Sequence, residues 1–120
     1  MIEEFVSRMF ALRDGAHLAH WAAKGPGSYA EHQALGAFYD EIVDRVDGII
    51  EAYQGFFGLI KKVNPLPYSK DKFIDQLQLE AKWLTENCDA VCNGNAAVEN
   101  MLYDLEGFMA QTYYKLKNLK

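Results

Sequence analysis

Two histidines and two carboxylates in the first half of the chain have the residue types and the spacing of a metal site. The second histidine follows the first by twelve residues, and the carboxylates come fifteen and nineteen residues after that second histidine. Imidazole nitrogen and carboxylate oxygen together form a ligand set that suits iron, zinc and manganese. The four candidate ligands are His20, His32, Asp47 and Glu51.

The spacing of these residues argues against a site built within one chain. Asp47 lies fifteen residues beyond His32 on one predicted helix, which at ~1.5 Å per residue separates them by roughly 22 Å. Metal–ligand distances are only ~2 Å. His20 stays close to His32 because a short turn joins their segments. If the long helix packs antiparallel on its twofold mate, the histidines of one chain meet the carboxylates of the other. We therefore predict a homo-oligomer, at least a dimer, with two identical sites.

Each candidate also has an ordinary structural explanation. Acidic residues at helical spacing usually form a solvated helix face, and a lone histidine at a helix end is more often hydrogen-bonded than a metal ligand. The joint spacing of the four residues is what favours a site. Val43 and Ile50 flank the carboxylates as apolar residues that a single bundle does not need. Such a mixed apolar and acidic face suits a contact between subunits.

The rest of the chain predicts the helices that must position these residues. Four helical segments are expected, and no strand. The first spans about residues 2–23 and stops at Gly25–Gly27, because this Gly-Pro-Gly sequence cannot continue a helix. Ser28 and Glu31 then predict a capping box at the start of the second helix.

Apolar residues recur at helical spacing in all four segments and predict one core-facing seam on each helix. Gly55 weakens the second helix, so residues 56–69 are expected to form a connection. Ser69 is a candidate N-cap for the third helix, and Asn95 for the fourth. The predicted seams comprise Phe5, Met9, Leu12, Ala16 and Ala19; Leu35, Phe38, Ile42, Val46, Ile49 and Tyr53; Phe73, Leu77, Ala81, Leu84, Cys88 and Val91; and Val98, Met101, Leu105, Met109, Thr112 and Leu116. This pattern predicts an all-α protein in which residues 1–120 form a single four-helix bundle domain.

Charge and composition narrow the range of partners. The net charge is −5 and the twelve Lys and Arg residues are scattered, so the chain lacks the basic surface that nucleic-acid binding requires. No apolar run reaches the ~18–20 residues of a membrane span. The N-terminal sequence MIEEF lacks the basic start of a signal peptide, and we expect a cytoplasmic protein. Cys88 and Cys92 are a weak zinc signal and are better explained as reduced core cysteines.

The region around the candidate ligands resembles a known family. HWAAKG at residues 20–25, then His32, then YDEIVDRVDGIIEAYQG at residues 39–55 resemble the ferroxidase segment of Dps-type mini-ferritins, in the ferritin-like superfamily. The intervals between the four candidate ligands are those of that family, and His17 also matches a histidine of many relatives. The resemblance covers residues 12–55, and the chain is most similar to compact members of the family, phage-encoded ones among them.

The resemblance implies a ferritin-like bundle with a long crossover between the second and third helices. It also implies an iron site at a dimer interface, where ferrous ion is bound and oxidised by peroxide or dioxygen. Trp21 would then pack beside the site, although it is equally well explained as a core anchor at a helix end. The chain differs from typical members in its short crossover, in having Gly36 where some members carry a carboxylate, and in lacking a lysine-rich tail. Typical members form dodecameric cages.

Two other functions are compatible with the same residues. Zinc is tetrahedral and redox-silent, and two histidines with two carboxylates can hold it as a structural ion between subunits. Alternatively, the chain is a metal-free dimeric module that keeps the bundle and acts through protein contacts alone.

Overall fold

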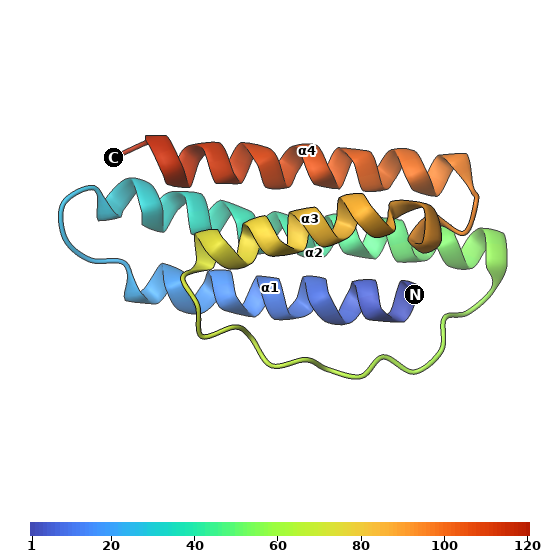
Figure 1. Ribbon diagram of the computed structural model, residues 1–120. Helices are drawn as coiled ribbons and strands as arrows, with labels where there is room; N and C mark the ends of the chain where they lie inside the picture. The colour runs from blue at the N-terminus through green and yellow to red at the C-terminus, as the bar shows by residue number, and fades with distance from the viewer.

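The computed structural model describes residues 1–120 as four helices without a strand (Figure 1). The prediction of an all-helical bundle is confirmed. None of the four helices is both long enough and apolar enough to cross a membrane. The helices are α1 (Ile2–Ala22), α2 (Ser28–Phe57), α3 (Phe73–Cys92) and α4 (Ala96–Asn118).

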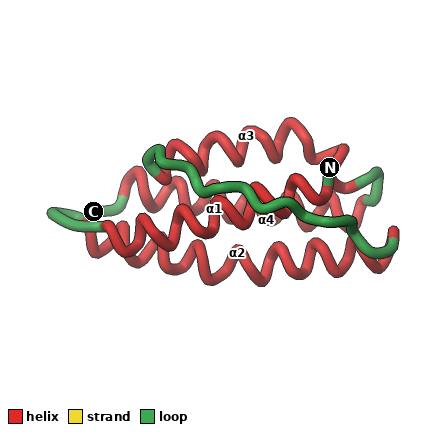
Figure 2. Tube along the Cα trace, turned by 90° about the horizontal axis from the view of Figure 1, so that it is seen from below, coloured by secondary structure: helices red, strands yellow, loops and turns green.

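The four helices pack as an elongated bundle of 47 × 25 × 22 Å. α1 contacts α2 and α3, and α4 contacts the same two helices. Residues 58–72 join α2 to α3 and run along the length of the bundle in both views (Figures 1 and 2). As a result the start of α3, at Phe73, lies near Pro26 and Gly27 in the turn between α1 and α2.

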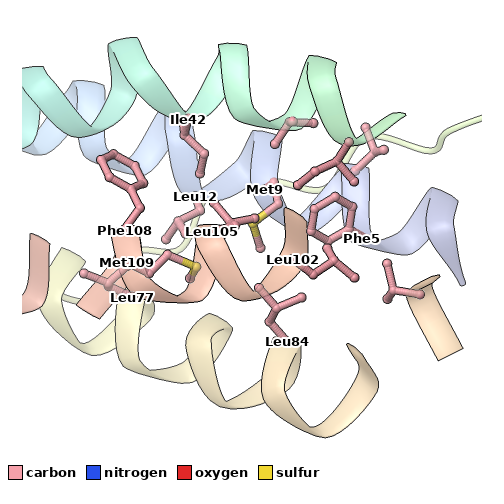
Figure 3. Close-up of a cluster of buried hydrophobic side chains, with 14 of the residues drawn as sticks. Phe5, Met9, Leu12, Ile42, Leu77, Leu84, Leu102, Leu105, Phe108 and Met109 are labelled. Atoms are coloured by element: carbon pink, nitrogen blue, oxygen red, sulfur yellow. The ribbon is translucent and has the colours of Figure 1, made fainter. Parts of the chain in front are cut away.

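The apolar seams meet in one continuous core (Figure 3). The predicted positions are buried, apart from a few at the ends and edges of the helices that are only partly buried: Ala19, Tyr53, Ala81, Met101 and Leu116. The sequence pattern missed Leu102 and Phe108, which are also buried. The buried face of α4 is thus wider than one seam, because the ring of Phe108 stacks on that of Phe38 with centroids 5.4 Å apart.

The predicted break between α1 and α2 is confirmed, but the predicted capping box is wrong. Ser28 is already the first helical residue, and Gly27 occupies the N-cap position with a left-handed φ of 79°. No side chain caps this end of α2. A left-handed backbone is readily adopted by glycine, so Gly27 turns the chain into the helix and the hydroxyl of Ser28 is not needed as a cap.

Of the other two predicted N-caps, Ser69 is wrong and Asn95 is confirmed. Lys72, not Ser69, precedes α3, and the hydroxyl of Ser69 accepts a hydrogen bond from the backbone N–H of Asp71 in a turn. The connection therefore spans residues 58–72 rather than 56–69, since α2 continues through Gly55 to Phe57. The predicted cap of α4 is confirmed: the side-chain oxygen of Asn95 accepts from the N–H of Val98 at 3.0 Å.

Specific polar contacts fasten the long connection to α1. The hydroxyl of Ser7 donates to the carbonyl of Asn64 at 2.6 Å, and the carboxylate of Glu3 accepts from the N–H of Lys61 at 3.0 Å. The connection thus covers one side of α1 and buries Ser7.

Both cysteines are free and buried, as predicted for core residues. The Sγ of Cys92 donates to the carbonyl of Asp89 at 3.4 Å. Burial, reinforced by the nearby carboxylate of Glu106, raises the pKa of Cys88 to about 11. That thiol therefore stays protonated at neutral pH and is a poor metal ligand or nucleophile.

We expect Asn95→Ala to lower the free energy of unfolding by ~1 kcal/mol, because it removes the only side-chain cap of a helix in this chain. Ser28→Ala is the matched control and should cost less than half as much, since its hydroxyl caps nothing. Urea unfolding followed by circular dichroism measures both. Equal losses in the two variants would contradict this account of the helix ends.

Candidate metal centre

Two reciprocal hydrogen bonds join His20, in the last turn of α1, to His32, near the start of α2. The Nδ1–H of His20 donates to the backbone carbonyl of His32 at 2.7 Å, and the Nδ1–H of His32 donates to the carbonyl of His20 at 2.9 Å. The two rings are stacked, with centroids 3.5 Å apart and planes inclined by 17°. The structure therefore brings together the two histidines that the sequence singled out.

These hydrogen bonds determine which ring nitrogen is free. A backbone carbonyl can only accept, so each Nδ1 must carry the hydrogen. In a neutral imidazole the lone pair is then on Nε2, on the far side of the ring from the carbonyl. Metal-binding histidines are commonly oriented in this way, by a hydrogen bond from the nitrogen that does not bind the metal. The pair thus presents two fixed rings, each with a free Nε2.

The histidine pair belongs to a larger aromatic cluster. The ring of Tyr39 lies edge-on to His20 at 5.3 Å and stacks on His17 at 4.0 Å, with planes 11° apart. The ring of Trp21 lies against that of His17, with centroids 4.4 Å apart, yet Trp21 is 69% exposed. Trp21 is therefore not a core anchor, and it extends the cluster toward the surface.

A glycine makes room for this arrangement. A Cβ atom built on Gly36 would lie 3.1 Å from Cε1 of His20 and 3.3 Å from Nδ1. These distances are tighter than ordinary van der Waals contact. The ring of His20 is fixed on its other side by the hydrogen bond and the stack with His32, so it has little freedom to move away.

The two candidate carboxylates lie one turn apart on the exposed surface of α2. Asp47 and Glu51 are both exposed. Arg45, the nearest cation along the helix, pairs instead with Glu41 at 3.6 Å and lies over the ring of Phe108. Neither Asp47 nor Glu51 is therefore neutralised by that arginine.

The histidine pair and the carboxylates do not come together within one chain. His32 and Asp47 lie on the same unbroken helix, which separates them by roughly 22 Å at ~1.5 Å per residue. No three His, Cys, Asp or Glu side chains of the chain are grouped closely enough to hold a metal ion. A single chain thus keeps the candidate nitrogen ligands and the candidate oxygen ligands apart, as two candidate half-sites.

Two residues of this region were not predicted from the sequence. Tyr39 follows His32 by seven residues and therefore shares its side of α2, so its spacing in the sequence indicates that it lies near the pair. Gly36 leaves room for the ring of His20, which points toward α2. No pattern in the sequence around either residue reveals that orientation.

Another polar cluster, between α1 and α3, has a structural explanation. The guanidinium of Arg8 donates to both carboxylate oxygens of Glu80 at 3.2 Å, pairs with Glu4, and lies over the ring of Trp83. Burial raises the pKa of Glu80 more than the contact with Arg8 lowers it. This ion pair joins α1 to α3. Both carboxylate oxygens of Glu80 are engaged by Arg8, so Glu80 is not free to bind a metal.

The fold and these residues define a helical-bundle protein with a paired histidine where its first two helices meet. Residues 20–116 match the model described as a family of unknown function (DUF5856), and the chain belongs to that family. The matched region includes both histidines and both carboxylates. No curated protein and no solved structure matches the chain significantly.

Replacing Gly36 by alanine should disturb the histidine pair, because the new Cβ presses on the ring of His20. Gly107→Ala, on α4, is the matched control, since nothing lies within 4 Å of its added Cβ. We expect the control to stabilise the protein by ~0.5–1 kcal/mol through helix propensity. Gly36→Ala should gain less than this or lose stability, and should shift the NMR resonance of the His20 Cε1 proton. Equal stabilisation with an unchanged resonance would contradict the close contact.

Proposed function

We propose that this protein is a Dps-like ferroxidase that binds Fe²⁺ between two subunits and oxidises it with peroxide or dioxygen. His20 and His32 of one chain and Asp47 and Glu51 of the other would bind the iron. The observation that carries the proposal is the reciprocal hydrogen bonding of the histidines, which leaves both Nε2 atoms free to bind a metal. The candidate carboxylates, farther along α2, are exposed.

The chemistry of the donors suits iron as the substrate. Imidazole nitrogen and carboxylate oxygen bind Fe²⁺, and anionic oxygen favours Fe³⁺ over Fe²⁺ and so promotes oxidation. Two ferrous ions supply the two electrons that peroxide accepts. The O–O bond then breaks, and two protons complete two waters. Glu51 would bridge two such ions, because a carboxylate has two oxygens that can bind separately.

A twofold dimer would assemble the site from the two half-sites. If α2 packs antiparallel on its mate, His32 of each chain comes opposite the Asp47–Glu51 turn of the other, and two equivalent sites result. Val43 and Ile50 are half-buried in the single chain and lie on the same stretch of α2 as the carboxylates. We infer that they complete their burial at this contact. We also infer a ferritin-like topology with a crossover, which the path of residues 58–72 supports.

Subunit mixing tests the shared site directly. One variant carries His20→Ala and His32→Ala, and the other carries Asp47→Ala and Glu51→Ala. Each variant alone lacks half of every site and should not oxidise Fe²⁺. After the subunits are exchanged, the mixed dimer has one complete site and one empty site. Activity should therefore return to about a quarter of that of the unaltered protein, because about half of the dimers in an equal mixture are mixed.

Light scattering provides the control that dimers form, and co-purification of the untagged variant with an affinity-tagged copy of the other shows that the subunits exchange. No recovery of activity in demonstrated mixed dimers, from an active parent protein, would eliminate the shared site. A dimer that binds Zn²⁺ tightly through these residues but never oxidises Fe²⁺ would instead favour the structural-zinc alternative.

A further inference from the structure

We propose that a groove between α3 and α4 binds a small aliphatic amine, whose ammonium group pairs with the carboxylate of Glu106. The groove runs along α4 from Glu106 to Tyr113. α3 and α4 form the side of the bundle opposite α1 and α2, so the groove shares no residue with the histidine pair. The inference therefore goes beyond the proposed ferroxidase and does not depend on it.

The groove is an open cavity of about 590 Å³ with an apolar floor. Leu77 of α3 and Met109 of α4 form this floor, and each is only 1% exposed (Figure 3). Ala81 and Ala110 also line the groove, and their small side chains fill little of the space. Binding sites for small molecules commonly have this volume and a largely apolar lining. The groove therefore has room for a short apolar chain.

One carboxylate lines the groove, and it lacks a partner. Oε1 of Glu106 is buried and makes no hydrogen bond. Burial raises the pKa of this carboxyl group, and no hydrogen bond or nearby cation lowers it. A charged group that is removed from water without gaining a partner is unfavourable, and a bound cation would offset this loss of hydration. The groove is thus complementary to a ligand with one positive charge.

The side chains around Glu106 do not supply that charge. Lys82, the one cation that lines the groove, pairs with Glu86 at 3.9 Å. The hydroxyl of Thr85 donates to the carbonyl of Ala81 at 3.1 Å, so its hydrogen is not available to the carboxylate. The carboxylate of Glu106 is therefore left to a ligand.

The rest of the groove favours an amine with a single charge. Tyr113 lies seven residues beyond Glu106 on α4, which is roughly 10 Å at ~1.5 Å per residue, and its hydroxyl accepts a hydrogen bond from Gln78 at 3.0 Å. Between these two ends, a ligand covers the floor formed by Leu77 and Met109. A primary alkylamine places its ammonium group at Glu106 and its chain on this floor. A polyamine would place further charges on apolar side chains, where burial without partners is unfavourable.

Titration with hexylammonium chloride, followed by calorimetry and by NMR of the groove residues, tests the site. We expect saturable binding with a Kd of about 1 mM or below. Hexanol has the chain without the charge, methylammonium has the charge without the chain, and both should bind at least tenfold more weakly. Glu106→Gln should also weaken the binding of hexylammonium at least tenfold. Asp104→Asn, at an exposed position of α4 outside the groove, is the matched control and should leave the Kd unchanged.

Three results would overturn the inference: no saturable binding, equal binding of hexanol and hexylammonium, or an unchanged Kd in Glu106→Gln that circular dichroism shows to be folded. The comparison with hexanol tests the charge in the unaltered protein, whatever the stability of the variant. Groove resonances that shift with protein concentration alone would also overturn it, because a second copy would then occupy the groove. Iron oxidation is measured separately, so failure here leaves the proposed function standing.

Discussion

The reciprocal hydrogen bonds between His20 and His32 are the interaction on which the rest of the candidate site depends. α1 ends at Ala22, so the carbonyl of His20 lies in the last turn, where no N–H of the same helix is available to it. The ring of His32 donates a hydrogen bond to that carbonyl, and the ring of His20 donates one to the carbonyl of His32. One arrangement thus joins α1 to α2, orients both rings and leaves the same nitrogen free on each.

Glycines in the turn between α1 and α2, and one on α2 itself, make this arrangement possible. Gly25 and Gly27 adopt left-handed φ angles of 91° and 79°, which allows the chain to reverse within the few residues between α1 and α2. Gly36 provides the space in which the His20 ring lies. A carboxylate side chain at position 36 would need room that this ring occupies.

Much of the fold was predictable because apolar periodicity and turn chemistry are local signals. The seam of α2 from Leu35 to Ile49 was predicted as it is observed, and so were the break at Gly25–Gly27 and the Asn95 cap. The Ser28 cap was wrong because Gly27 occupies its place through backbone conformation, which residue preference alone does not specify. Phe108 was missed because its burial depends on stacking with Phe38 from another helix.

The candidate site was predictable only in part, because its contacts also depend on how separate helices pack. Spacing alone indicated that the histidines lie together and far from the carboxylates on α2. It could not indicate the hydrogen bonds to the carbonyls, the involvement of Tyr39 or the exposure of Trp21, because each depends on how α1 is rotated against α2. Asp47 and Glu51 are exposed on α2, and Asp47 lies about 22 Å along the helix from His32.

Anaerobic addition of Fe²⁺ followed by one peroxide for every two ferrous ions tests the central claim most directly. The account predicts ferric absorbance that rises much faster than in buffer, saturates with the number of sites, and disappears when His20 and His32 are both replaced by alanine. Oxidation no faster than that of free Fe²⁺, or an unchanged rate in that double variant, would contradict it.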